Sequence, residues 1–133
     1  MVDNVNRAVR VFVVEDQAHV RYVLKTYLAA LGHSVVAEAY KVDAAIKVAA
    51  EADYDLAIVD LNLGSEKSYD VVDVVMRSGK ALLIVTGYGR NGLNSAYEQC
   101  SILVKPYTRA ELGRSIQLAL GQTYSGQISR HRS

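Results

Sequence analysis

The chain has 133 residues, half of them hydrophobic and 22% charged, with a formal net charge of +1 at pH 7. Because domains average roughly 150 residues, we expect one domain with a substantial core. The near balance of 15 basic and 14 acidic residues excludes attachment to nucleic acid or anionic lipid by bulk charge. The single cysteine excludes the disulfide-rich secreted class. No apolar run is long enough for a membrane helix or a signal peptide, so we expect a cytoplasmic protein.

Short apolar segments alternate along the chain with amphipathic stretches. The segments predict five strands, at Val9–Val14, Ser34–Ala39, Asp55–Asp60, Ala81–Thr86 and Ser101–Lys105. Most of them are rich in Val, Ile and Leu, as are strands that are covered on both faces. This composition favours parallel strands in the middle of a layered fold.

The stretches between the strands have the apolar spacing of helices. Helices are predicted around Val20–Leu31, Val42–Ala49, Val71–Val75 and Leu112–Leu120. Gly32 and Gly79 stand where the first and third of these are expected to end. Thr108 and Glu111 have the spacing of a capping box, which predicts the start of the last helix.

Strands and helices in alternation predict an α/β fold, a doubly wound five-stranded parallel sheet with helices on both faces. The helix between the fourth and fifth strands is expected to be short, about two turns around Leu93, Ala96 and Tyr97, because glycines interrupt this part of the chain. We expect one domain over residues 1–121. Residues 122–133 are polar and predict a mobile C-terminal tail.

Polar residues stand at the carboxyl ends of the predicted strands, where such sheets bind ligands. They are Glu15, Asp16, Asp60, Thr86 and Lys105. In the strand order 2-1-3-4-5 the first and third strands are neighbours, so the three acids are expected in one cavity. Clustered carboxylates repel one another and favour a divalent cation, and Mg²⁺ suits oxygen ligands. A purely structural ion-pair network is the alternative, but one lysine leaves an excess of negative charge.

This set of residues also suits phosphoryl transfer, which depends on positioning and on charge stabilisation. Asp60, alone on the central strand, is the best-placed covalent acceptor. Together the motifs resemble the receiver domain of two-component response regulators over about residues 9–120. The resemblance is carried by Glu15-Asp16, by Asp60 within Ile58–Asn62, by Thr86-Gly87 and by Lys105-Pro106.

The resemblance implies a flavodoxin-like receiver fold in which Asp60 is phosphorylated from the phosphohistidine of a sensor histidine kinase. It implies a Mg²⁺ site formed by Glu15, Asp16, Asp60 and the main-chain carbonyl of Asn62. It further implies that Thr86 and Lys105 contact the phosphoryl oxygens, and that the Lys105–Pro106 peptide bond is cis.

The sequence departs from the family at Ile102, where receivers usually carry Tyr or Phe, and at Gly64, where many carry Pro. The segment Leu83–Tyr88 resembles a subgroup with a Phe-Ala-Thr-Gly signature followed by Tyr, often found beside sensor kinases of the HWE type. We therefore expect phosphorylation to order the Gly87–Tyr97 segment instead of rotating an aromatic ring. We also expect Tyr88 to overhang the phosphoryl group and slow its hydrolysis.

The expected function is that of a stand-alone receiver, phosphorylated by a kinase or phosphotransferase, that acts through a protein partner or as a phosphate sink. No turnover of an external substrate is expected, and neither nucleic acid nor membrane is an expected partner. One alternative is a small Mg-dependent aspartyl-phosphate phosphohydrolase, although no cap domain or separate general acid is visible near Asp60. The other is a degenerate receiver that serves only as an interaction module, against which the intact set of acids, Thr86 and Lys105 argues.

Three further features have ordinary interpretations. Gly87–Gly92 spells a dinucleotide fingerprint, but it follows the fourth strand and has no acidic residue at the required distance. Cys100 is predicted to be a small buried apolar residue. His33 is predicted to lie on the surface.

Overall fold

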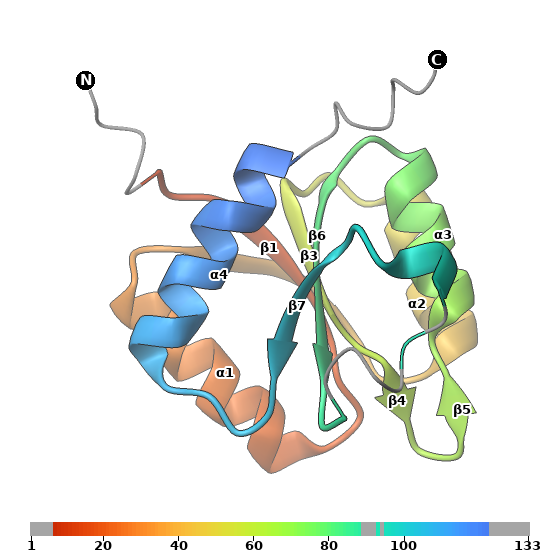
Figure 1. Ribbon diagram of the computed structural model, residues 1–133, viewed down its shortest axis with the longest axis horizontal. Helices are drawn as coiled ribbons and strands as arrows, with labels where there is room; N and C mark the ends of the chain where they lie inside the picture. The colour runs from red at the N-terminus through yellow and green to blue at the C-terminus, as the bar shows by residue number, and fades with distance from the viewer. Residues whose placement is uncertain (1–6, 89–92, 94, 123–133) are drawn as a thin grey trace.

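Five parallel strands form the centre of the molecule in the computed structural model, which describes residues 7–88, 93 and 95–122 (Figure 1). The strands are β1 (Arg10–Val14), β2 (Ser34–Ala39), β3 (Leu56–Asp60), β6 (Ala81–Thr86) and β7 (Ser101–Val104). Their spatial order is β2-β1-β3-β6-β7, which confirms the predicted order 2-1-3-4-5. Each strand begins and ends within one residue of its predicted range.

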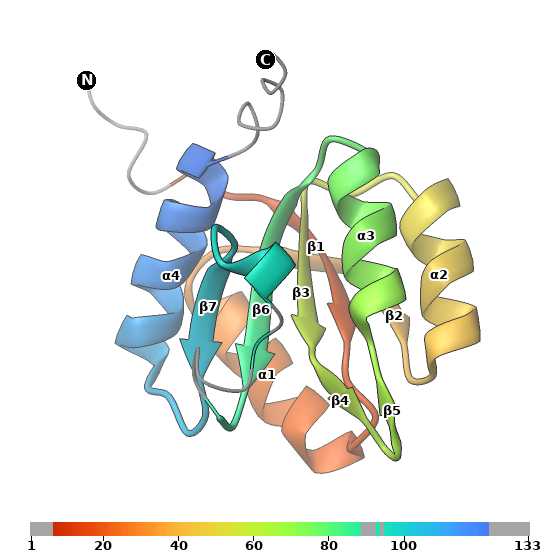
Figure 2. The ribbon, with the colours of Figure 1, turned by 45° about the vertical axis from the view of Figure 1, so that its right-hand side comes forward.

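Four α-helices cover the two faces of this sheet (Figure 2). They are α1 (Ala18–Ala30), α2 (Val42–Glu51), α3 (Tyr69–Arg77) and α4 (Arg109–Gln122). The capping box at the start of α4 is confirmed, since the Glu111 N–H donates to Thr108 Oγ1 and the Thr108 N–H to Glu111 Oε1. Gly32 has a φ of +89° just after α1, a left-handed conformation in which glycine is favoured. None of the helices in the described ranges has the length and apolar composition that crossing a membrane requires.

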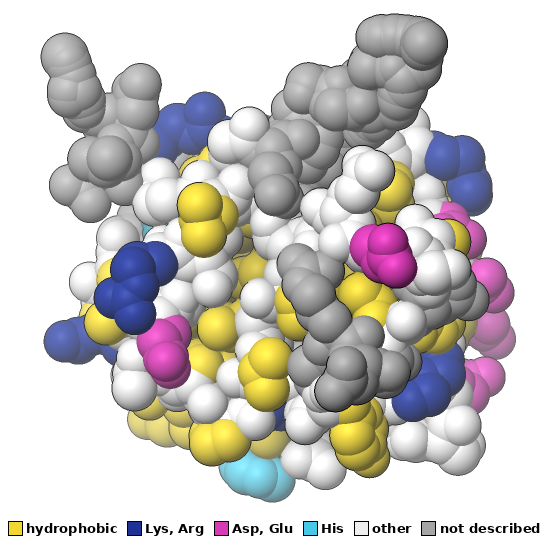
Figure 3. Space-filling view, viewed as in Figure 1, with side chains coloured by type: hydrophobic (Ala, Val, Ile, Leu, Met, Phe, Trp, Pro, Cys, Tyr) yellow, Lys and Arg dark blue, Asp and Glu magenta, His cyan; other side chains and the backbone are white. Residues whose placement is uncertain are grey.

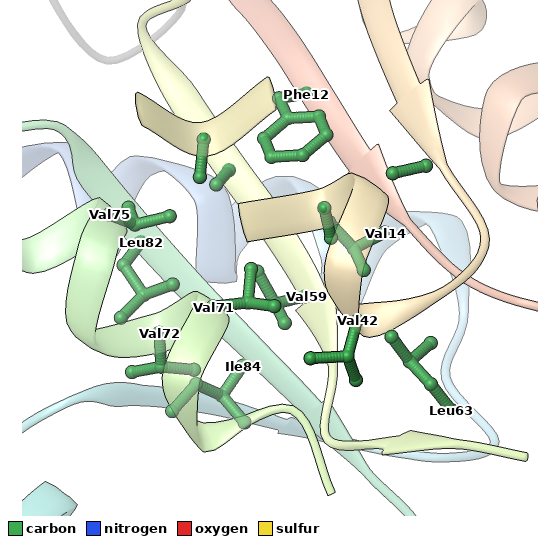
Figure 4. Packing of buried hydrophobic residues seen from close by; sticks show 14 of the residues in the cluster. Phe12, Val14, Val42, Val59, Leu63, Val71, Val72, Val75, Leu82 and Ile84 are labelled. Carbon is green, nitrogen blue, oxygen red and sulfur yellow. The ribbon is translucent and has the colours of Figure 1, made fainter. Parts of the chain in front are cut away.

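The core has two layers, one on each face of the sheet. Side chains of alternating strand residues pack against α2 and α3 on one face, as Figure 4 shows for Val14, Val59 and Ile84. The other face packs against α1 and α4. All five residues of β3 are buried, because both of its faces are covered. The central strand is therefore held rigidly on both sides, up to its carboxyl end.

A short helical element was predicted between the fourth and fifth strands. Among the described residues of this segment, Ser95–Tyr97 form a 3₁₀ turn, η3. Its position is fixed by Tyr97, whose ring stacks on Tyr69 of α3 at 4.8 Å between centroids. The Tyr97 hydroxyl also donates to Asp73 Oδ1 at 2.7 Å, so this turn is attached to α3 through one aromatic side chain. On the face of the molecule seen in Figure 3, apolar side chains reach the surface between α4 and α3.

An antiparallel hairpin that the sequence did not predict follows β3. It consists of β4 (Asn62–Leu63) and β5 (Glu66–Lys67), joined by a two-residue turn. Gly64 in this turn has a φ of +62°, which proline cannot adopt because its ring fixes φ near −65°. The departure from the family at Gly64 therefore has a conformational reason. The hairpin projects at the end of the sheet toward which the strand arrows point (Figure 1).

His33 is buried, so the prediction that it lies on the surface is wrong. Its side chain is packed beneath the start of β1, and the Val9 N–H donates to its Nδ1 at 3.1 Å. Cys100 is half-buried against the α2 and α3 side of the core. Gln122, expected in the tail, is the last residue of α4. Residues 123–133, and residues 89–92 and 94 of the Gly87–Tyr97 segment and its glycine motif, lie outside the described residues.

Candidate functional site

The carboxyl ends of β1 and β3 bring three acids together. Glu15 and Asp16 follow β1, and Asp60 is the last residue of β3. Each of the three offers a carboxylate oxygen, and these oxygens lie within 4.8 Å of one another. The carboxylates of Glu15 and Asp60 are almost completely buried. Their mutual repulsion is therefore little reduced by solvent.

Lys105 lies opposite these acids, directly after β7. Its Nζ is 2.6 Å from Asp60 Oδ2 and 3.4 Å from Glu15 Oε1. The main chain fixes this position, because the Lys105 N–H donates to the carbonyl of Thr86 at the end of β6. The Lys105–Pro106 peptide bond is cis, as the resemblance implies.

The charges of the site alter the pKa values of two of its groups. Burial and the hydrogen-bonding contact with Asp60 raise the pKa of Glu15 to about 7. Burial opposes the charge of Lys105, but the hydrogen bond to Asp60 and the attraction of both acids raise its pKa above the ordinary value. Lys105 is therefore a cation at neutral pH, whereas Glu15 exchanges a proton readily near neutrality.

Backbone and hydroxyl groups orient the two buried acids. The Asn62 N–H donates to Asp60 Oδ1 at 2.9 Å, so Lys105 and the hairpin bind different oxygens of this carboxylate. The Gln17 N–H donates to Glu15 Oε2 at 3.0 Å. Since both hydrogen bonds come from the chain directly after each acid, the local backbone presets both carboxylates.

Two residues that the sequence analysis missed support the acids from behind. The Ser68 hydroxyl donates to the main-chain carbonyl of Asp60 at 2.6 Å and is fully buried. The Arg21 guanidinium donates to the carbonyl of Glu15 at 2.9 Å and stacks on the Tyr40 ring at 3.7 Å. Ser68 stands where a helix N-cap is expected, but its side chain makes no capping hydrogen bond. The sequence gives no signal for either partner, because both contacts depend on the fold.

Four further predicted residues have different positions relative to this centre. Thr86 is buried, and its Oγ1 accepts the N–H of Tyr88 at 3.1 Å, which leaves the hydroxyl proton as a donor. Gly87 and Tyr88 are exposed, and 69% of Tyr88 is accessible to solvent. Ile102 is half-buried and packs on the α2 and α3 side of the core. The structure therefore places Thr86 in the site, Tyr88 on its rim and Ile102 at the edge of the core.

The donor set fits a magnesium ion. Mg²⁺ prefers oxygen ligands and binds one or two carboxylates, with water or phosphate oxygens completing its shell. Glu15, Asp16 and Asp60 supply three such oxygens at one edge of the sheet, and Lys105 forms ion pairs with two of these acids. The turn of the hairpin borders this cluster, because a Cβ atom on Gly64 would lie 3.8 Å from Asp16 Oδ2.

The fold and the site together define a receiver-like α/β domain, with an acid pair, a central aspartate and an opposing lysine. A family model of the response regulator receiver domain matches residues 11–117, and the chain belongs to this family. No curated protein matches the sequence.

Solved structures of receivers share the fold at low sequence identity. The response regulator PhyR from Brucella abortus matches with a TM-score of 0.78 and 19% identity, over 97% of this chain and 55% of that one. The receiver domain of Erythrobacter litoralis PhyR matches with a TM-score of 0.75 and 20% identity, over 87% and 92% of the two chains. SdrG from Sphingomonas melonis Fr1 matches with a TM-score of 0.74 and 24% identity, over 90% of this chain and 98% of that one. The chain spans about half the length of the longer PhyR structures.

Proposed function

We propose that Asp60 accepts a phosphoryl group from the phosphohistidine of a sensor kinase, and that this modification switches the binding of a protein partner. The observation that carries the proposal is the contact of Lys105 Nζ with Asp60 Oδ2 beside two further acids. A buried aspartate at the end of a central strand is a nucleophile in a fixed position. The lysine and the hydroxyl of Thr86 supply donors where the charge of a phosphoryl group must be held.

In the transfer step an oxygen of the Asp60 carboxylate attacks the phosphorus atom. A phosphorus–oxygen bond forms, the phosphorus–nitrogen bond of the phosphohistidine breaks, and its electron pair leaves with the imidazole, which takes up a proton. Lys105 exchanges its contact with Asp60 Oδ2 for a phosphoryl oxygen, and Thr86 donates its hydroxyl to another. Glu15, Asp16 and Asp60, with the main-chain carbonyl of Asn62, would hold Mg²⁺, which neutralises charge on the transferred group.

The rim residues have modulating roles in this proposal. Tyr88 stands two residues after Thr86 and overhangs the phosphoryl group, so it slows the attack of water. Gly87 allows the backbone after Thr86 to move when the threonine turns toward the phosphoryl group. Ile102, packed at the edge of the core, has no ring to rotate, so the switch acts through the segment that ends at Tyr97.

The partners are proteins in this proposal, and the reaction takes place in the cytoplasm. The donor is a sensor histidine kinase, of the HWE type by the resemblance of Leu83–Tyr88, or a phosphotransferase. One of the structures that share the fold is described as the anti-anti-sigma factor PhyR from Bartonella quintana. By analogy with the anti-anti-sigma role of that protein, the output proposed here is the binding of a protein partner. No turnover of an external substrate is involved.

The test is incubation with acetyl phosphate and Mg²⁺, followed by intact mass measurement and mapping of the labelled residue. We expect one hydroxylamine-labile phosphoryl group per chain on Asp60, absent from Asp60→Asn. The matched control is Asp70→Asn, because Asp70 is an exposed acid on α3 and should leave labelling unchanged. Labelling at another residue, or repeated release of inorganic phosphate from a small phosphoester, would contradict the proposal.

A further inference from the structure

The hairpin after β3 brings a second lysine to the rim of the site. Lys67 of β5 pairs directly with Asn62 of β4, so their side chains lie on the same face of the hairpin. Lys67 Nζ donates to Asn62 Oδ1 at 2.5 Å. The same ammonium group lies 5.8 Å from the centre of the Tyr88 ring, within the range of a cation–π contact.

These contacts form a series that runs from the carboxylate of Asp60 to the hydroxyl of Thr86. The Asn62 N–H binds Asp60 Oδ1, the Asn62 side chain binds Lys67, and Lys67 faces the ring of Tyr88. The Tyr88 N–H returns to Thr86 Oγ1. The side chain of Lys67 thus joins Asn62, which follows Asp60, to Tyr88, which follows Thr86.

We propose that Lys67 is a positioning residue that holds Tyr88 and the side chain of Asn62 at the rim of the phosphorylation site and thereby slows hydrolysis of the aspartyl phosphate. The proposal rests on the phosphorylation of Asp60 proposed above. In hydrolysis a water oxygen attacks the phosphorus atom and a new phosphorus–oxygen bond forms. The bond to the Asp60 oxygen breaks, its electron pair stays on the carboxylate, and the water proton passes to phosphate or solvent.

The attacking water must approach on the side of the phosphorus atom opposite the Asp60 oxygen, which is the outer side of the site. Tyr88 by itself is a poor barrier, since 69% of it is exposed and the hydrogen bond from its backbone N–H to Thr86 does not fix the ring. The cation–π contact with Lys67 connects the ring to the hairpin. Gly64, with a φ of +62°, fixes the turn of this hairpin. A ring held in this way stays in the path of the water for a larger fraction of time.

The experiment measures the rate of dephosphorylation of the full chain after removal of acetyl phosphate, by intact mass over time in Mg²⁺. We expect Lys67→Met to lose phosphate about threefold to fivefold faster than the wild type, the factor that an exposed cation–π contact supplies. Lys67→Arg keeps the charge and the donor and should stay near the wild-type rate. Lys47→Met is the matched control, because Lys47 is an exposed lysine on α2.

A double variant separates positioning from a general effect of charge. If Lys67 acts through Tyr88, the double variant with Lys67→Met and Tyr88→Ala should be no faster than Tyr88→Ala alone. A Lys67→Met protein that is phosphorylated on Asp60 and hydrolyses at the wild-type rate would overturn the role of Lys67 and leave the proposed function intact. A double variant in which the rate increases of the two single variants multiply would also overturn the role of Lys67. A wild-type chain that takes no phosphoryl group on Asp60 would overturn both proposals together.

Discussion

Asp55 and Asp60 stand at the two ends of one strand, directly before and at the end of β3, and their surroundings differ completely. Asp55 is partly exposed, and Arg10 of the neighbouring strand donates to it from its backbone N–H at 2.8 Å and from its guanidinium at 2.9 Å. The hydrogen bond from the Arg10 side chain holds the pKa of Asp55 below its ordinary value. Asp60 is buried, and it shares one lysine with another buried acid.

Burial and charge balance, not residue type, therefore distinguish the two ends of the sheet. We call the amino end the structural end, and the carboxyl end, which carries the proposed reaction, the reactive end. At the amino end, Arg10 binds two acids, Asp53 and Asp55, in contact with water, so their remaining charge is screened. At the carboxyl end, Glu15 and Asp60 are buried beside Asp16, and Lys105 forms an ion pair with both buried acids. Among the described residues, this arrangement carries an excess of negative charge that a divalent cation would balance.

The largest effect should come from removing the cation of the reactive end. In Lys105→Met the phosphoryl oxygens lose a charged donor, and we expect labelling of Asp60 by acetyl phosphate to slow about 100-fold, the effect of losing one preorganised donor. The measurement is the initial rate of labelling by intact mass.

The matched change at the other end is Arg10→Met, which removes a cation bound to two acids in the same way. We expect its labelling rate to stay within about twofold of the wild type, because surface ion pairs are screened from the distant reactive end. Equal losses in the two variants would show that the two ends do not differ as argued.

A smaller effect is expected from the hydroxyl that supports Asp60 from behind. Ser68→Ala leaves the buried carbonyl of Asp60 without its hydrogen bond, and we expect the free energy of unfolding to fall by about 1–3 kcal/mol. Urea denaturation measures this change.

Ser65→Ala is the control for this variant, because Ser65 is an exposed serine in the turn of the hairpin. If Ser68→Ala and Ser65→Ala unfold at the same urea concentration, the bond to Asp60 contributes nothing to stability.

The sequence predicted the parts of this comparison that depend on local pattern. Apolar runs located the five strands, and the polar residue that ends each run located Asp60, Thr86 and Lys105. The hairpin after β3 could not be predicted, because strands of two residues are too short to show an alternating pattern.

Contacts between distant segments also could not be predicted. Tyr97 stacks on Tyr69, 28 positions away in the chain, and this contact attaches the turn η3 to α3. The Arg21 guanidinium of α1 stacks on the ring of Tyr40, 19 positions away in the chain. No spacing rule connects such pairs, since their distance is set by the packing of the whole fold.

The smallest expected effect concerns the amino end, where the sequence-based prediction for His33 was wrong. Burial lowers the pKa of His33, so the folded chain binds a proton less readily than the unfolded chain. As the pH falls below about 6.5, the unfolded state takes up the proton first, and the free energy of unfolding decreases.

His33→Asn offers the Val9 N–H another acceptor that does not titrate, so urea midpoints of this variant should change less between pH 7 and pH 5. His19→Asn should keep the wild-type dependence, because His19 is exposed on α1. A His33→Asn protein with the same pH dependence as the wild type would assign the acid sensitivity to other groups, and the burial of His33 would then contribute nothing to it.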